Sequence, residues 1–258
     1  MSNVVAAEID SAVQLVEQDR RPISYTDDRQ VSADFLIMPA AEIRRYHGPR
    51  SDTVFPREYA FYLLGDVEGR TILDLGCGDG VNTVILASLG AQVVSLDISE
   101  KSLELTGQRA TANKVDNRVQ LLYSDATAIP IDAARVDAVL CTGLLHHVDP
   151  ITTARQIRRV LRPGGLAVFD EAVAGPTPFT EDNSQLNLTK VDAVCRAVGR
   201  FGRRREFWLT TRFISRMPAR TFSSAAKAAQ RLDAAVLQRF PFARKLASPM
   251  VWEARKES

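Results

Sequence analysis

The chain has 258 residues, of which 45% are hydrophobic and 25% are charged, and these shares are typical of one globular domain with or without an insertion. They exclude a chain that is disordered throughout its length. Its 33 basic and 31 acidic residues give a net charge of +2, which does not indicate a nucleic-acid-binding protein.

The first part of the chain has no regular pattern. Residues 8–20 have the apolar spacing of a short amphipathic helix. Prolines at positions 22, 39, 49 and 56 then interrupt the chain repeatedly. We therefore expect residues 1–65 to form an N-terminal cap or substrate lid, and residues 66–258 to form the main domain.

Strands and helices alternate from residue 70 onwards. Each predicted strand is short and apolar, and each predicted helix has about ten residues or more. The predicted strands are 71–75, 92–96, 119–123, 136–141 and 166–169, and the predicted helices are 81–89, 99–112, 151–161 and 186–199. Strands separated by helices indicate βαβ units, so the fold class is α/β with a parallel sheet.

Two more strands are predicted near the C-terminus. Residues 206–209 form the sixth, and residues 249–254 form the seventh at the edge of the sheet. A helical insertion over residues 212–247 separates them. The stretch from residue 190 to 258 holds 16 basic and 5 acidic residues, so it carries +11 while the rest of the chain carries −9.

A glycine-rich turn follows the first strand, in the sequence Gly76-Cys77-Gly78-Asp79-Gly80. Glycines there allow the backbone to approach a ligand closely, and the following helix directs its free N–H groups at the same place. A turn without a ligand is the alternative. The spacing does not fit a nicotinamide site, which requires glycine where Val81 stands, and no G-K-[ST] of a P-loop follows.

Acidic residues follow the next two strands. Asp97 ends the second strand 21 residues after Gly76, where its carboxylate is in reach of ribose hydroxyls. Asp125 follows the third strand, where it is able to accept from an adenine amino group. Each acid taken alone has a simpler explanation, as a helix cap or an ordinary loop residue. With Asp74 in the first strand, three acids lie at three successive strand ends, and together they indicate a nucleoside site.

Five motifs together resemble those of class I S-adenosylmethionine-dependent methyltransferases, of the branch that acts on small molecules such as natural products, sugars and quinones. The motifs are Ile72–Gly80, Val94–Ser99, Ser124–Ala126, Leu144–Val148 and Leu161–Gly165. The resemblance covers about 100 residues, and it implies a Rossmann-like, seven-stranded fold. It also implies a set of cofactor contacts: Asp74, Gly76, Cys77, Gly78, Gly80, Asp97, Ile98, Asp125, Ala126 and Thr142.

Transfer to a hydroxyl or a protonated amine needs a base to take the acceptor's proton. His146 and His147 follow the fourth strand, and Asp170 and Glu171 follow the fifth. A histidine oriented by a carboxylate is a suitable base. We assign His146, His147 and Asp170 as catalytic, although the histidines are also explained by packing or capping.

Substrate contacts are predicted at three positions: Tyr46, His47 and Glu171. No metal site is expected, because the chain has three histidines and three widely spaced cysteines. The cysteines indicate a reducing compartment, and neither a signal peptide nor an 18-residue apolar run is present, so the cytoplasm is the predicted location.

The acceptor is expected to be a small molecule, and no nucleic acid is expected, because the motif of base-modifying amino methyltransferases is replaced by Cys141-Thr142-Gly143-Leu144. Methylation at oxygen or nitrogen is the main hypothesis. C-methylation of a quinone, isoprenoid or lipid-like acceptor is an alternative, and a regulatory protein that binds S-adenosylmethionine without turnover is another.

The basic C-terminal segment has several interpretations. A solvated helical surface is the simplest one. An amphipathic cap on an anionic membrane would admit a lipophilic acceptor, and a lid rich in arginine would hold an anionic one. RNA binding is less favoured, because the aromatic residues have helical spacing. The sequence does not determine the oligomeric state.

Overall fold

The computed structural model describes residues 36–53, 55–173, 186–207, 228, 231–233, 235–237, 239–240 and 249–258. The helix predicted at residues 8–20 lies outside these residues, as does most of the predicted insertion at 212–247. The secondary structure from residue 71 to residue 142 follows the prediction closely.

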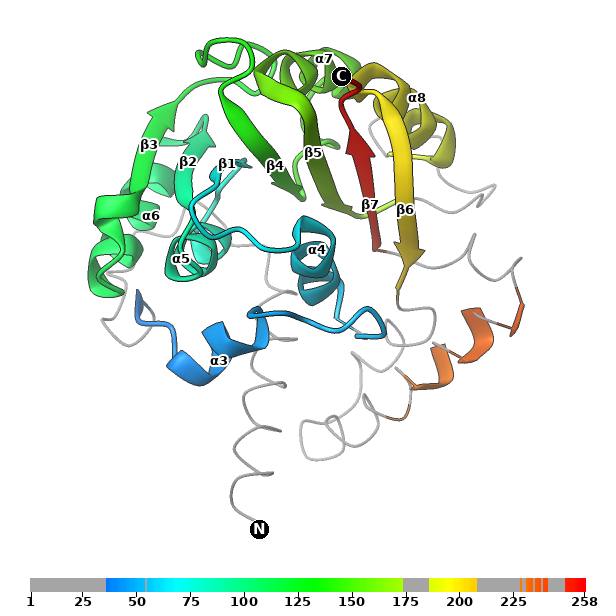
Figure 1. Ribbon diagram of the computed structural model, residues 1–258, viewed down its shortest axis with the longest axis horizontal. Coiled ribbons are helices and arrows are strands. Elements are labelled where there is room, and N and C mark those ends of the chain that lie inside the picture. The colour runs from blue at the N-terminus through cyan, green and yellow to red at the C-terminus, as the bar shows by residue number, and fades with distance from the viewer. Residues whose placement is uncertain are drawn as a thin grey trace.

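A seven-stranded sheet forms the centre of the molecule, in the order β3-β2-β1-β4-β5-β7-β6 (Figure 1). Its strands are β1 (Thr71–Leu75), β2 (Gln92–Asp97), β3 (Val119–Tyr123), β4 (Val136–Thr142), β5 (Leu161–Glu171), β6 (Arg200–Glu206) and β7 (Met250–Arg255). The first five strands pair in parallel, and β7 is antiparallel to both of its neighbours. From β1 the chain adds strands first on one side, as β2 and β3, and then on the other side, as β4 and β5. The carboxyl ends of β1 and β4 therefore form the switch point at which α/β proteins bind ligands.

Helices cover both faces of the sheet. They are α3 (Ala40–Arg45), α4 (Pro56–Leu64), α5 (Val81–Ser88), α6 (Glu100–Ala112), the short η1 (Asp116–Arg118), α7 (Pro150–Val160) and α8 (Leu188–Val198). In Figure 1, α7 and α8 lie on one side of the sheet and α4 lies on the other. None of the helices in the described part of the chain is long and apolar enough to cross a membrane.

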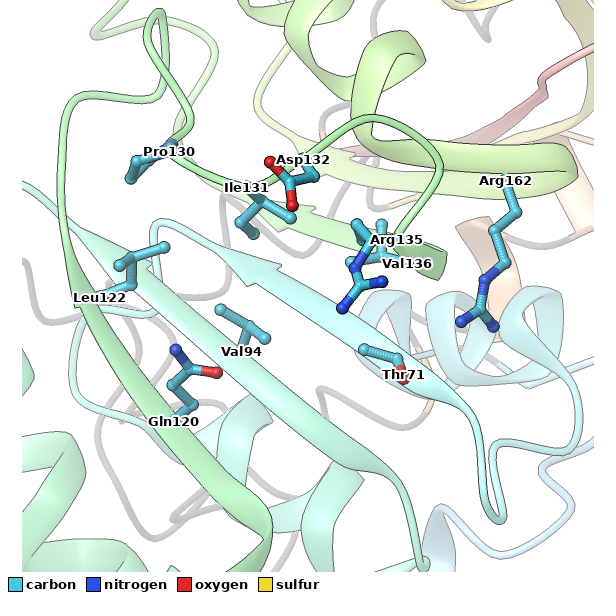
Figure 2. A pocket seen from close by; sticks show the side chains of 10 residues that line it. All are labelled: Thr71, Val94, Gln120, Leu122, Pro130, Ile131, Asp132, Arg135, Val136 and Arg162. Carbon is cyan, nitrogen blue, oxygen red and sulfur yellow. The ribbon is translucent and has the colours of Figure 1, made fainter.

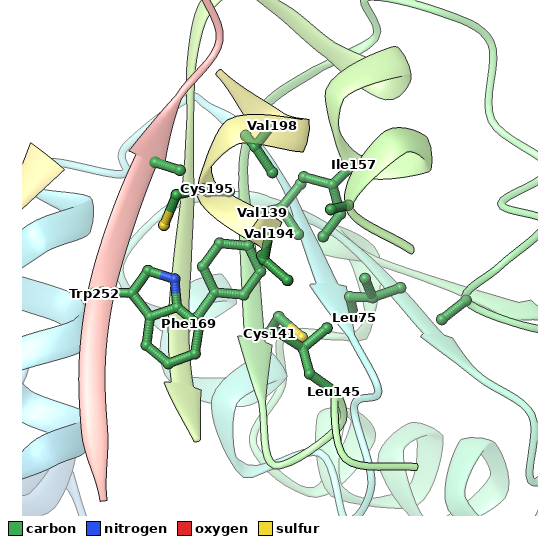
Figure 3. Close-up of a cluster of buried hydrophobic side chains, with 14 of the residues drawn as sticks. Leu75, Val139, Cys141, Leu145, Ile157, Phe169, Val194, Cys195, Val198 and Trp252 are labelled. Carbon is green, nitrogen blue, oxygen red and sulfur yellow. The ribbon is translucent and has the colours of Figure 1, made fainter. Parts of the chain in front are cut away.

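The core beneath α7 and α8 is predominantly apolar. Phe169 of β5 and Trp252 of β7 stack with ring centroids 5.1 Å apart, and Val194 of α8 lies beside them (Figure 3). The helices lie flat on the sheet because their apolar residues recur at helical spacing. This layer holds the carboxyl ends of β4 and β5 in fixed positions.

The core on the opposite face joins the N-terminal segment to the sheet. Phe61 of α4 is 2% exposed and lies in the same buried cluster as Ile72 of β1 and Val168 of β5. The boundary predicted after residue 65 therefore does not coincide with a break in packing. Helix α4 is part of the main domain.

Two predictions about the last strands are wrong. The sixth strand is Arg200–Glu206 instead of residues 206–209, and β7 lies between β5 and β6, so β6 is the edge strand. Most of the side chains of β6 are exposed. Its sequence, RFGRRRE, therefore lacks the alternation by which strands are recognised.

Candidate active site

The glycine turn links β1 to α5, and its glycines are required by protein packing. Gly80 has a φ of +80°, and a Cβ there would lie 2.8 Å from Cα of Thr106 on α6. Gly76 has a φ of +76°, and a Cβ there would lie 3.2 Å from the side chain of Leu144. Gly78 also has a positive φ, of 54°. Only glycine adopts these angles readily, so the turn keeps its shape and brings α5 close to α6.

Asp97 ends β2 and holds this turn directly. Its Oδ2 accepts a hydrogen bond of 3.0 Å from N–H of Gly78, and its Oδ1 accepts one of 2.9 Å from N–H of Ser99. Ser99 in turn caps α6 by accepting from N–H of Ser102. Ile98 is 62% exposed, so its apolar side chain is accessible next to the carboxylate.

Asp74 lies beneath the turn and is completely buried. Its Oδ2 accepts a 2.6 Å hydrogen bond from Oγ1 of Thr83, whereas its Oδ1 has no hydrogen-bond partner among the described residues. Oδ1 of Asn82 likewise lacks one. Burial raises the pKa of Asp74 to about 7, and the Thr83 hydrogen bond opposes that shift. Unsatisfied buried acceptors are costly, so these two atoms indicate a bound hydrogen-bond donor.

Asn82 and Thr83 were not identified from the sequence. A signal was present, because they are the polar pair in an otherwise apolar first half of α5. Nδ2 of Asn82 also donates to Oγ1 of Thr142 over 3.3 Å, which connects α5 to the end of β4. Thr142 therefore lies next to α5, and its role as a cofactor contact stays a prediction.

Asp125 follows β3 in an exposed loop. Its Oδ1 accepts two hydrogen bonds of 2.7 Å, from the N–H and the hydroxyl of Thr127. These bonds hold the pKa of Asp125 below its usual value. The neighbouring Ala126 is buried and belongs to the core, so that only its backbone is placed to meet a ligand.

Cys77 does not present its side chain to a ligand. The thiol is buried and lies 3.5 Å from Oγ1 of Thr106, and burial raises its pKa far above the usual range. A contact from Cys77 to a cofactor is thus limited to its backbone.

This set of hydrogen-bond acceptors fits S-adenosylmethionine. The unpaired oxygens of Asp74 and Asn82 match an ammonium group, and the carboxylate of Asp97 matches a pair of ribose hydroxyls. The exposed Ile98 and the second oxygen of Asp125 match the face and the amino group of an adenine. Helix α5 adds its N-terminal dipole, since Gly80 at its N-cap provides no side-chain cap.

A histidine and a carboxylate meet beside this set. Glu171, at the end of β5, accepts hydrogen bonds through Oε1 from N–H of Leu144 and Leu145, at 2.7 and 2.9 Å. Its Oε2 lies 3.3 Å from Nδ1 of His146. The side chain of Glu171 is fully buried and that of His146 is 35% exposed. The prediction that Glu171 contacts substrate is therefore corrected, because the carboxylate is enclosed by the turn that follows β4.

The two histidines differ in their surroundings. The hydrogen bond that Glu171 accepts from His146 raises the pKa of His146 above its usual value, and burial opposes the shift. His147 is exposed, and its ring centroid lies 3.9 Å from that of His146. Asp170 is half-buried, and its backbone carbonyl accepts from N–H of Gly143. The carboxylate that holds His146 is thus the one at position 171.

The substrate contacts predicted in the N-terminal segment are corrected in part. Tyr46 is 4% exposed, and its ring packs against Phe61 with centroids 4.9 Å apart. Burial raises the pKa of its phenol. Tyr46 is therefore a core residue of α3 and α4, while the adjacent His47 is exposed.

A hollow of about 410 Å³ lies at the opposite ends of the strands. It is lined by Thr71 at the start of β1 and Val136 at the start of β4, together with Arg135, Leu122 and Ile131 (Figure 2). The glycine turn, Asp97 and His146 follow strand ends, so this hollow is separate from the candidate site.

Residues 73–169 match the family described as "Methyltransferase domain". The chain is similar to a demethylmenaquinone methyltransferase of Clavibacter sepedonicus, with 39% identity over 129 residues, which are 50% of this chain and 51% of the relative. It is also similar to a ubiquinone biosynthesis O-methyltransferase of Alkalilimnicola ehrlichii, with 32% identity over 47% of this chain and 49% of the relative. The chain thus spans about half the length of these curated relatives.

The fold is likewise similar to that of a solved geranyl diphosphate C-methyltransferase of Streptomyces coelicolor A3(2). The TM-score is 0.59 and the identity 15%, over 83% of this chain and 86% of the other. The segment from residue 73 to residue 169 is therefore similar to a methyltransferase domain, and the sheet around it has the class I, Rossmann-like fold predicted from the sequence.

Proposed function

We propose that the protein transfers a methyl group from S-adenosylmethionine to a hydroxyl oxygen of a small acceptor. One observation carries the proposal: the His146–Glu171 pair lies at the same edge of the sheet as Asp74, Asp97 and the glycine turn. A hydroxyl must lose its proton when it is methylated, and a histidine beside a carboxylate is suited to take that proton.

The cofactor, when bound, supplies a methyl group on a sulfonium that is already activated for displacement. The chain's own residues position the two reactants and remove a proton. Asp97 and Asp74 would hold the ribose and the ammonium group, and His146 would take the hydroxyl proton. The rest of the rate enhancement comes from orientation and from exclusion of water.

The acceptor we propose is a quinone-like aromatic hydroxyl compound. The names of two relatives support this class, since one refers to demethylmenaquinone and the other to ubiquinone biosynthesis. Such acceptors are apolar apart from their oxygens. The acceptor would enter beside the half-exposed ring of His146.

Incubation with methyl-¹³C-labelled S-adenosylmethionine and a set of catechols and hydroquinones tests this function. We expect S-adenosylhomocysteine to form, and a product whose ¹³C shift is that of a methoxy group. Formation of neither compound with any acceptor, despite tight cofactor binding, would favour a regulatory protein without turnover.

C-methylation is the second candidate, since the fold is shared with a solved geranyl diphosphate C-methyltransferase. The same ¹³C spectrum separates the two reactions, because a methyl on carbon resonates far upfield of a methoxy group. A carbon acceptor would also make the reaction less dependent on His146.

We further propose that the basic segment contacts an anionic membrane through residues 231–240. Residues 231–233, 235–237 and 239 are helical. Leu232 is 55% and Phe240 46% exposed, and the exposed Arg231 and Arg239 lie beside them, while Leu237 is buried. Exposed apolar and basic side chains on one surface are typical of helices that lie on anionic lipid.

Two other arginines of the segment are already used by the fold. Arg203 pairs with Glu253, and Arg205 donates to the carbonyl of Ser51. We therefore expect Leu232→Gln with Phe240→Gln to reduce sedimentation with phosphatidylglycerol vesicles at low salt. Equal sedimentation of that variant and the wild type would contradict the proposal.

A further inference from the structure

The carboxylate of Glu171 is in an unusual position for a residue next to a substrate site. Its side chain has no exposed surface, yet it carries two oxygens that the fold must satisfy. Oε1 is satisfied by the backbone N–H groups of Leu144 and Leu145. Oε2 is left to face Nδ1 of His146.

This arrangement fixes the turn and the ring together. The N–H groups of residues 144 and 145 have few other acceptors, since the chain there has left β4 and α7 begins only at Pro150. The ring of His146 is attached to the same turn, so its orientation depends on the carboxylate. The thiol of Cys141, 3.9 Å from Oε1, is the other group that faces Glu171.

The distance between Oε2 and Nδ1 also selects a tautomer. A carboxylate has only acceptor sites, so a bond to it requires a proton on Nδ1. In a neutral imidazole the proton is then absent from Nε2, which becomes the acceptor. Most free histidines favour the opposite tautomer, with the proton on Nε2.

We propose that Glu171 is a positioning residue, which holds His146 with its proton on Nδ1 and leaves Nε2 to take the proton of the methyl acceptor. This inference rests on the proposed function and deepens it. It also replaces Asp170, the carboxylate expected from the sequence, with its neighbour.

The proposed step balances in atoms and charge. The O–H bond of the acceptor breaks and its proton moves to Nε2, while an oxygen electron pair forms the new O–CH₃ bond. The S–CH₃ bond breaks, and its electrons remain on sulfur, which leaves as the thioether of S-adenosylhomocysteine. The imidazolium, stabilised by Glu171, later releases the proton to water.

The groups around the ring are few, so its titration is interpretable. Glu171 on β5 and the adjacent ring of His147 are the titratable groups described in contact with it. The chain has three histidines, so their imidazole nitrogens can be resolved in a long-range ¹H–¹⁵N spectrum of the full chain. The His146→Gln variant assigns the signals.

The test is this spectrum recorded across pH for the wild type, Glu171→Gln and Glu171→Asp. We expect the Nδ1–H tautomer in the wild type, and a titration midpoint above that of an ordinary histidine. In Glu171→Gln the midpoint should fall and the tautomer should shift towards Nε2–H, and Glu171→Asp should restore part of both. Asp149→Asn is the matched control, because asparagine caps α7 equally well and leaves Glu171 in place.

A wild-type ring that is mainly in the Nε2–H form would overturn the proposal, even if Glu171→Gln fails to fold. An unchanged midpoint and tautomer in a folded Glu171→Gln would also overturn it. These readouts need neither cofactor nor acceptor. Failure here is therefore distinguishable from failure of the methyltransferase function, which cofactor titration and product formation test separately.

Discussion

Asp74 combines a buried carboxylate with an unsatisfied oxygen, and this combination has a cost in the absence of a ligand. Its pKa of about 7 in the fold lies well above the usual 3.8, so ionisation is opposed by burial. The stability that this group contributes is fully present below about pH 3.8 and is lost as the pH rises through 7. A cationic ligand would reverse that loss, because it favours the ionised form.

We expect Asp74→Asn to raise the free energy of unfolding at pH 8, by about 2–4 kcal/mol relative to the wild type. The difference should shrink towards pH 5, where the native carboxyl is mostly protonated. Urea denaturation at both pH values measures it. The same variant should bind S-adenosylmethionine more weakly. A variant that is no more stable than the wild type at pH 8 would show that burial of the ionised Asp74 does not destabilise the fold.

The two histidines should differ in their effect on the reaction. His146→Gln should lower kcat by about 10²–10⁴, because it removes the base, whereas His147→Gln should retain most of the activity. Only the neutral imidazole accepts a proton, so the wild-type rate should fall as the pH drops through the raised pKa of His146. Rate measurements from pH 5 to 9 check this, and equal losses in both variants would contradict the assignment.

At the scale of residues, the sequence predicts which side chains reach the site better than it predicts what they contact. Asp74, Asp97 and Asp125 were identified because parallel strands bring their carboxyl ends to one edge. The burial of Tyr46 and Glu171 depends on packing between distant segments, which local pattern does not reveal.

The junction of β1 and α5 depends on close contact between α5 and α6. Gly80→Ala would place a Cβ against the backbone of Thr106 and force a left-handed angle on alanine. We expect a loss of about 2–4 kcal/mol in the free energy of unfolding.

Gly69→Ala is the control for that variant. Gly69 also has a positive φ, of 69°, but a Cβ there would meet nothing within 4 Å. It should therefore cost only about 1–2 kcal/mol. Equal losses of unfolding free energy in urea denaturation would mean that the close contact between α5 and α6 does not account for the cost of Gly80→Ala.

The edge strand β6 is tied to β7 through one ion pair. Arg203 lies 2.8 Å from Oε1 of Glu253, whose side chain is 8% exposed, and its guanidinium also lies over the ring of Tyr62. Arg203→Gln should lower the free energy of unfolding by about 1–2 kcal/mol, because it leaves a nearly buried carboxylate without its cation.

Arg200→Gln on the same strand provides the comparison. Arg200 is exposed, and no side-chain partner is found for it in the described part of the chain. Its loss should change the free energy of unfolding by less than about 0.5 kcal/mol. Similar values for the two variants in thermal or urea unfolding would show that the ion pair contributes nothing.

At the scale of elements, the parallel part of the sheet was predictable and its antiparallel end was not. Strands β1 and β4 are almost entirely buried, and they read as apolar runs between turns. β6 is exposed and basic, so its register comes from pairing with β7 and not from its own pattern. The apolar residues after it, beginning at Phe207, gave a misleading signal.

The whole molecule is arranged around one edge of its sheet. The glycine turn, the three acids and the His146–Glu171 pair all lie at or just after the carboxyl ends of parallel strands, and two separate apolar cores fix those ends from both faces. The fold was predictable from motifs that cover under half of the chain. The acceptor was not, because those motifs are not specific to any one substrate.

Calorimetric titration of the full chain with S-adenosylmethionine, alongside Asp97→Ala, tests the central claim most directly. We predict one site of about micromolar affinity, near −8 kcal/mol, and binding about 1.5–3 kcal/mol weaker in the variant, which loses a charged acceptor. NADH should not bind. Absence of binding by the wild type, unchanged affinity in Asp97→Ala, or tight binding of NADH would contradict the assignment of this edge as a methyltransferase site.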